Sequence, residues 1–208
     1  MITDVLEKIH SRFPGVRVEL VNNPGPSAQH SLLVDAKDAR AVAGFLRDEL
    51  HFDFASNVSG VDWPPRKIKE AVVRKETVDG VEKEVKETVE HDVPGCLEAV
   101  YHLYSVARKC GPITLRMRTG DRDKNVTLPS LTPVWKSADF QEREVFDLFG
   151  IRFEGHPDLR RLLMWEEYAD HPMRKDFVAP DDFEYEPTPH DEILKRVKAR
   201  AATTGEGA

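Results

Sequence analysis

Cysteine is scarce in this sequence: Cys96 and Cys110 are the only two among 208 residues, and no Cys-x-x-Cys pair occurs. Thiols this far apart cannot by themselves hold an iron–sulfur cluster or a structural zinc, because both need clustered ligands. Two free thiols are a simpler interpretation than a disulfide, which no spacing supports. A Gly-x-Gly-x-x-Gly stretch and a P-loop are missing as well, so the sequence carries no dinucleotide- or nucleotide-binding motif.

A basic excess and long apolar runs are also missing. The formal net charge is −7, whereas domains that bind nucleic acid usually carry an excess of lysine and arginine, which argues against nucleic acid as the main partner. No uninterrupted apolar run approaches the roughly 20 residues that span a bilayer. Residues 1–10 are amphipathic and do not predict a secretory signal. We therefore expect any role at a membrane to depend on a partner.

The composition that is present, 40% apolar and 32% charged, is typical of a globular protein. Helix and strand signals alternate along the first part of the chain, separated by turn clusters rich in proline, glycine and asparagine. The predicted elements are a helix capped by Thr3 that runs to Phe13, strands at 17–21, 30–34 and 52–61, and a helix capped by Asp35 with Ala39, Val42, Leu46 and Leu50 facing inward.

Residues 66–95, mostly lysine, glutamate and valine, allow two interpretations. Asp79-Gly80 between valine-containing flanks is typical of a two-residue hairpin turn. Valines also recur at helical spacing, at Val78, Val81, Val85 and Val89. The hairpin is favoured because β-branched residues suit strands and glycine is unfavourable inside a helix. We expect an exposed, solvated insertion.

Residues 97–106 and 113–118 give the clearest strand patterns. Strand neighbours joined by short turns predict a mixed or antiparallel sheet with helices packed on one face, an α+β domain. We expect this domain to span 1–177. Residues 178–208 are predicted to form an acidic, proline-containing extended tail with a short amphipathic helix at 190–201.

The densest charge pattern lies in residues 135–177. A helix is predicted from Ala138 to Phe149, with Ser137 as its N-cap and Gly150 just past its C-terminus. Within that stretch, acidic, basic and aromatic side chains alternate closely, so their distribution around the helix decides what they can do.

At about 100° per residue, Glu142 lies in the middle of the apolar face of this helix. A buried carboxylate must be paired or protonated, so we hypothesise an ion pair between Glu142 and Arg160 or Arg161. The opposite face carries Phe140, Arg143, Glu144 and Asp147. An aromatic beside a charge cluster suits an interface.

Three chemical interpretations of this stretch compete. Glu144, Asp147 and His156 could ligate a metal, although the helix ends at Gly150 and the histidine would have to fold back. Glu142 and Asp147 could be an acid/base pair, although they point in different directions around the helix. A docking surface with internal salt bridges needs no substrate pocket and fits the pattern best.

Two His-Pro pairs each lead to a basic pair: His156-Pro157 to Arg160-Arg161, and His171-Pro172 to Arg174-Lys175. Proline holds the residue before it in an extended conformation, so each pair is predicted to be a rigid corner that presents a basic segment. A hydrogen-bonded structural histidine is favoured over one that titrates near neutral pH.

The full pattern in register comprises Glu142-Arg143-Glu144, Asp147, Phe149-Gly150-Ile151, Phe153, Gly155-His156-Pro157 and Leu159-Arg160-Arg161-Leu162. Further landmarks are Gly60-Val61-Asp62-Trp63-Pro64, Tyr101-His102-Leu103, Pro133-Val134-Trp135 and His171-Pro172 with Arg174-Lys175-Asp176. This pattern resembles the 30 kDa subunit family of respiratory complex I, the C-type subunit of the bacterial proton-translocating NADH:quinone oxidoreductase. The chain departs from that family at Asp170, where glycine is common, and in the greater length of 66–95.

The resemblance implies an assembly subunit of the peripheral arm that packs against the large D-type subunit (49 kDa type), which holds the quinone site, and against neighbouring subunits. We refer to this large partner as the quinone-site subunit. The resemblance also implies that this chain holds no catalytic, cofactor-binding or metal-ligating residues. FMN, iron–sulfur clusters, NADH and quinone would be bound elsewhere in the complex. The expected location is peripheral, on the cytoplasmic side of the bacterial inner membrane, with the membrane reached only through the complex.

Two alternatives remain. The chain could be the equivalent subunit of a related membrane-bound hydrogenase, or of a dehydrogenase with another electron donor. It could also be a free-standing metalloenzyme that uses Glu144, Asp147 and His156.

Overall fold

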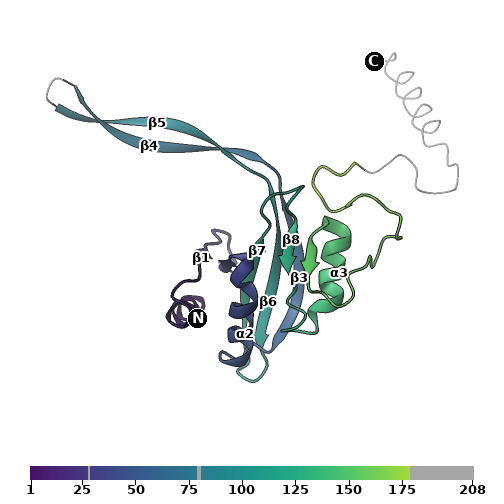
Figure 1. Cartoon of the computed structure of the whole chain (residues 1–208). Helices are drawn as coiled ribbons and strands as arrows, with labels where there is room; N and C mark the ends of the chain where they lie inside the picture. Colours follow the sequence, from purple (N-terminus) through teal and green to yellow (C-terminus); the bar gives the residue numbers. More distant parts are fainter. Residues whose placement is uncertain (28, 79–80, 179–208) are drawn as a thin grey trace, which may run out of the picture. The chain divides into compact units, whose positions relative to one another are not determined.

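A five-stranded mixed sheet forms the centre of the protein (Figure 1). The computed structural model describes residues 1–27, 29–78 and 81–178, with the backbone alone for 69–78 and 81–89. The strands of this sheet are β1 (Val18–Val21), β2 (Ser31–Val34), β3 (Phe54–Trp63), β6 (Cys96–Ser105) and β7 (Cys110–Arg118). Their spatial order is β1-β2-β7-β6-β3, with β2 and β7 parallel and the other neighbours antiparallel.

Helices cover one face of this sheet. The helical elements are α1 (Ile2–Arg12), the short 3-10 turn η1 (Ala36–Asp38), α2 (Ala39–Asp48) and α3 (Ala138–Phe149). Alternate residues of β6 are fully buried and join the apolar residues of α2 and α3 in one core cluster: Leu97, Ala99, Tyr101 and Leu103. Because side chains alternate across a strand, the residues between them point to the other face. The α+β prediction, with helices on one face of a mixed sheet, is confirmed.

Residues 66–93 form a hairpin rather than a helix. Its strands, β4 (Arg66–Val78) and β5 (Val81–Val93), pair with each other in antiparallel register, and Figure 1 shows them as a long two-stranded ribbon. The expected turn residues Asp79 and Gly80 lie outside the described residues.

A small parallel pair, β8 (Thr127–Pro129) with β9 (Arg152–Glu154), flanks α3 in the chain. The guanidinium of Arg40, on α2, donates to the carbonyls of Ser130 and Glu154. This contact ties α2 to the ends of both short strands.

Of the predicted helix caps, Thr3 is wrong, whereas Asp35 and Ser137 occupy the N-cap positions of η1 and α3. Helix α1 begins at Ile2, before Thr3. Asp35 and Ser137 precede η1 and α3, but neither side chain makes a capping hydrogen bond. The Ser137 hydroxyl donates instead to the carbonyl of Ala55, 2.9 Å away on β3. Tertiary packing of the helix start therefore overrides the local capping preference.

The first compact unit of the chain is Met1–Phe177. The predicted helix at 190–201, and the extended segment after Val178, lie outside the described residues. Among the described ranges, no helix has both the length and the apolar character needed to cross a membrane.

Gly60 sets how closely α3 approaches β3. A Cβ atom built at Gly60 would overlap the ring of Phe149, at the end of α3. We expect Gly60→Ala to lower the free energy of unfolding by about 1–3 kcal/mol, because the ring must move within a packed core. Urea denaturation measures this change.

Gly44, inside α2, is the matched control because a Cβ there meets no atom within 4 Å. Gly44→Ala is expected to raise the free energy of unfolding by about 0.5–1 kcal/mol, since alanine is the better helix former. Equal effects of the two substitutions would contradict the close contact at Gly60.

Candidate functional site: the segment held by α3

The Glu142 carboxylate is completely buried under α3, as its place on the apolar face predicts. Its partner is not an arginine, so the hypothesis of a pair with Arg160 or Arg161 is wrong. Its donors are the Tyr101 hydroxyl at 2.9 Å, the Leu131 amide at 2.8 Å, the Ser130 hydroxyl at 2.6 Å and the Thr132 hydroxyl at 3.2 Å. Burial raises the pKa of Glu142, although these donors act in the opposite direction.

Asp147 is the second fully buried carboxylate of α3, on the side of the helix away from Glu142, where the following segment covers it. One oxygen accepts the backbone N–H groups of Leu162, Leu163 and Met164, at 3.0, 2.6 and 2.9 Å. The other accepts Arg161 Nη1 at 2.6 Å. Burial alone would raise the pKa of Asp147, but the donors outweigh it and the pKa lies below its usual value.

The basic pair after the first His-Pro corner is divided, because Arg161 faces inward and binds Asp147 whereas Arg160 faces solvent. Arg143, on the same side of α3 as Asp147, is buried, and its guanidinium donates to the carbonyls of Arg160 and Arg161 at 3.3 Å each. The Arg160 side chain is exposed and pairs with Asp158. Arg143 and Asp147 are buried because the chain after β9 returns across part of the side of α3 opposite the sheet, whereas Phe140 and Glu144 on α3 stay exposed.

Both histidines have the structural role that was favoured. The Nδ1 atom of His156 accepts the Asp158 amide, so its Nε2–H donates to the carbonyl of Asp139, 3.1 Å away. His171 Nδ1 lies 3.1 Å from the carbonyl of Asp147. Burial lowers the pKa of His171, which favours the neutral ring at pH 7.

The second His-Pro corner covers the C-terminus of α3. The amide of Met173 donates to the carbonyl of Leu148, and Arg174 Nε donates to that of Phe149 at 2.8 Å. A cation at this end also complements the helix dipole. Gly150 ends α3 with a φ of 81°, and a Cβ there would meet the His171 ring. This position therefore requires glycine.

The remaining residues of the pattern occupy supporting positions. Gly155, with a φ of 76°, lies against the Arg40 guanidinium. Pro157 and Pro172 both lie in the segment after β9. Glu144 is exposed.

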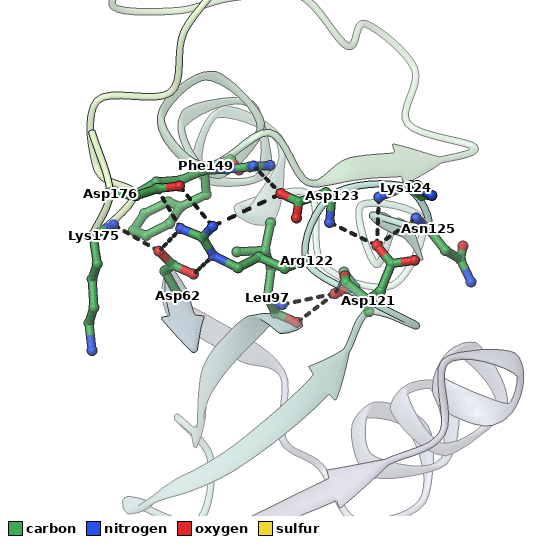
Figure 2. Close-up of polar contacts among 12 residues, drawn as sticks. Asp62, Leu97, Asp121, Arg122, Asp123, Lys124, Asn125, Phe149, Lys175 and Asp176 are labelled. Atoms are coloured by element: carbon green, nitrogen blue, oxygen red, sulfur yellow. Dashed lines mark hydrogen bonds and ion pairs between the residues drawn. The ribbon is translucent and has the colours of Figure 1, made fainter. Parts of the chain in front are cut away.

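A cluster of hydrogen-bonded charged groups attaches residues 174–176 to the sheet (Figure 2). Arg122 binds the buried carboxylate of Asp62 through Nε and Nη2, at 2.7 and 2.8 Å, and also binds Asp176. The Lys175 amide donates to Asp62 at 2.8 Å. Hydrogen bonding to Arg122 lowers the pKa of Asp176 to about 2. Arg174 reaches Asp123 in the same cluster, at 3.3 Å.

The candidate reactive groups are bound by other groups of the protein itself. The metal set Glu144, Asp147 and His156 is not assembled, since Asp147 and His156 are each bound to other protein groups. Within the described ranges no group of three or more histidine, cysteine or acidic residues could hold a metal ion. Glu142 and Asp147 bind different segments and form no acid/base pair. These contacts hold the segment after β9 against α3.

The sequence analysis did not assign the donors of two buried carboxylates. Glu142 is bound by Tyr101 and Ser130, and Asp62 is bound by Arg122. The available signal was the buried Glu142 itself, since a carboxylate inside an apolar face needs several donors. Ser130 and Thr132 lie between β8 and α3, and no local pattern indicates that they fold back on α3.

Asp147→Asn should lower the free energy of unfolding by about 3 kcal/mol, because an amide cannot accept all the donors and Arg161 loses its carboxylate partner. Urea denaturation gives the value, and limited proteolysis should show faster cleavage within 159–177. The exposed Glu144→Gln is the control and should change neither readout. An Asp147→Asn protein with unchanged stability and cleavage would exclude this carboxylate as the organiser of the segment.

Low pH should weaken the ion pair between Asp176 and Arg122. The folded pKa of Asp176, about 2, lies below the unfolded value, so its stabilising contribution is present above about pH 4 and is lost as the pH falls toward 2. The melting temperature of Asp176→Asn should be lower than that of the wild type at about pH 5, and the two should converge near pH 2. A difference that grows toward low pH would contradict the assignment. Because 65% of the Asp176 side chain is exposed, the difference is expected to be small and to shrink with salt.

Comparison with known proteins identifies the family. Residues 32–183 match the model of the respiratory-chain NADH dehydrogenase 30 kDa subunit. The C subunit of NADH-quinone oxidoreductase from Roseiflexus sp. (strain RS-1) is 37% identical over 174 residues, which cover 83% of this chain and 81% of that protein. A C subunit of the same enzyme from Rhizobium meliloti is 37% identical over 64% of this chain, and the match spans 57% of that relative's length. A relative from Bacteroides fragilis, whose name joins the C and D subunits, is 38% identical over 63% of this chain and 21% of its own length.

A chain from an archaeal membrane-bound sulfane sulfur reductase has a similar fold. Its TM-score is 0.50 at 17% identity, covering 89% of this chain and 96% of that one. The family model spans most of the chain, and relatives such as the Roseiflexus protein match it over most of both lengths. The chain therefore belongs to the family of 30 kDa subunits of the respiratory-chain NADH dehydrogenase, whose bacterial members are named as the C subunits of NADH-quinone oxidoreductase.

Proposed function

We propose that this chain is a non-catalytic assembly subunit of a proton-translocating NADH:quinone oxidoreductase, and that residues 159–178 dock against the quinone-site subunit. The observation that carries the proposal is a set of exposed apolar side chains on α3 and on the segment that α3 holds. The Bacteroides fragilis relative supports the choice of partner, because its name assigns the C and D subunits to one polypeptide.

The docking segment exposes large apolar side chains in a rigid frame. The exposed fractions are 62% for Phe140, 61% for Leu163, 51% for Trp165 and 55% for Met173. A contiguous exposed apolar patch is typical of an interface, and three of these side chains lie on the single segment that α3 holds. We define this set of four as the α3 apolar surface.

Pre-organisation favours docking. The backbone of Leu163 is fixed by its hydrogen bond to Asp147, and that of Met173 by its hydrogen bond to the carbonyl of Leu148. The Arg143 guanidinium lies 5.3 Å from the ring centroid of Phe140. A surface that is already ordered loses less conformational entropy on binding.

A non-catalytic role is supported by the way the titratable groups are used. Glu142 accepts hydrogen bonds from hydroxyls and an amide, Asp147 from amides and an arginine, and His156 is bound through both ring nitrogens. Groups held in this way maintain geometry and are poorly placed to exchange protons with a substrate. In this proposal, FMN, iron–sulfur clusters, NADH and quinone belong to other subunits, and the chain lies on the cytoplasmic side of the membrane.

The shared fold with the sulfane sulfur reductase chain favours one alternative, a related membrane-bound complex with another electron donor. Identification of the subunits that co-purify separates the two. An NADH-oxidising flavin subunit supports the first, and a hydrogenase-type subunit supports the second.

Leu163→Asp tests the docking surface. A charge at this exposed position should leave the fold intact but abolish most recovery of the quinone-site subunit when the tagged full chain is purified from membranes, because the interface would bury an unpaired carboxylate. We expect recovery to fall about tenfold or more.

Val106→Asp is the matched control, because Val106 is 64% exposed in the turn between β6 and β7, outside the α3 apolar surface. It should leave recovery of the quinone-site subunit unchanged. Equal recovery with both variants, or no recovery of that partner with the wild type, would refute the proposal.

A further inference from the structure

The face of the five-stranded sheet opposite α2 and α3 contains a groove of about 730 Å³, which we call the outer groove. Sheet residues that line it include Trp63, His102, Thr114 and Arg116. Register supports this placement, because His102 pairs with Thr114 across β6 and β7, and Tyr101, next to His102, faces the core. The loop after β1, through Asn22, and the base of the β4–β5 hairpin, through Arg66, also line the groove.

Buried polar atoms without a partner are concentrated in the residues that line the outer groove. Trp63 Nε1, His102 Nδ1, Thr114 Oγ1 and Arg116 Nε are all buried and make no hydrogen bond. The indole and the guanidinium nitrogens can only donate, and the hydroxyl and the imidazole can donate as well. Thr114 is 6% exposed, so this hydroxyl is deep in the structure. These atoms lie just beneath the groove surface, so an occupant that meets them when the side chains rotate should be rich in acceptors.

The charge of the outer groove has one sign. Its charged lining residues are Arg66, Arg116 and Arg118, and no aspartate or glutamate of the described ranges lines it. The buried Glu98 pairs with both Arg116 and Arg118 and offsets part of this charge. The guanidinium of Arg66 lies 5.4 Å from the Trp63 ring centroid. The groove thus stays positive in a protein whose net charge is −7.

We propose that the outer groove binds an acidic, extended peptide segment of a neighbouring subunit, which places glutamate or aspartate carboxylates against Arg66 and Arg116. The volume is far larger than an inorganic anion needs and falls in the range of sites that hold several residues or a drug-sized molecule. Carboxylates suit guanidinium donors, and peptide carbonyls are further acceptors for the unpaired groups. This inference rests on the proposed place of the chain in a multisubunit complex, but it uses the sheet face opposite α3.

Photo-crosslinking within the purified complex tests this proposal. A benzophenone amino acid replaces Asn22, an exposed residue at the groove, in the full chain, and mass spectrometry identifies the crosslinked peptide after irradiation. The expected product is a segment of another subunit that contains at least two acidic residues close together. Arg66→Gln should reduce the yield about fivefold or more, because it removes a charged donor. Arg152→Gln, an exposed arginine on β9, is the control and should not reduce it.

Thr114→Val separates binding from folding. Loss of an unpaired buried hydroxyl should leave the melting temperature unchanged or higher, while the crosslinking yield falls. Crosslinks to a segment without acidic residues, to this chain's own tail or to lipid would overturn the proposal, as would no crosslink or a yield insensitive to Arg66→Gln. Recovery of the quinone-site subunit is scored in the same sample. Its recovery without the acidic crosslink refutes the groove alone, and the acidic crosslink without its recovery refutes the contact with the quinone-site subunit alone.

Discussion

The buried carboxylate of Asp147 is the interaction on which the arrangement of the candidate site depends. It gathers three consecutive backbone amides and one guanidinium around a single charge. A charge at this depth would cost several kcal/mol if it were unpaired, so the chain after β9 can pack on α3 only in a conformation that supplies those donors. The position of Leu163 and its neighbours follows from that requirement.

Two further sets of contacts hold α3 and the segment that Asp147 organises. Glu142, on the other side of α3, binds the loop that contains Ser130, so the helix is held to the sheet and to the following segment by opposite faces. The cluster of Asp62, Arg122 and Asp176 then attaches the end of the segment to β3. Between these attachments the apolar side chains remain exposed. Polar interactions fix the geometry, and the exposed apolar side chains are the basis of the proposed docking.

The sequence predicts much of the fold and less of the site. Helix α3 has the predicted bounds because Gly150 and the apolar spacing are local signals, and the burial of Glu142 follows from the same periodicity. The burial of Asp147 and Arg143 could not be predicted, because it depends on a segment that returns from beyond β9. The donors to Glu142 come from β6 and from a loop, at chain separations that no local pattern encodes. Asp35 and Ser137 occupy N-cap positions but make no capping hydrogen bond, and Ser137 shows why, since packing directs its hydroxyl to the carbonyl of Ala55.

Hydrogen–deuterium exchange on the chain, alone and within the purified complex, tests the docking claim most directly. The amides of residues 165–175 that are not bonded to α3 should exchange slowly in the complex and faster in the isolated chain, while exposed amides of the turn between β6 and β7 should exchange alike in both. Equal exchange of residues 165–175 in the two states would contradict the proposal that this segment is the interface with the quinone-site subunit.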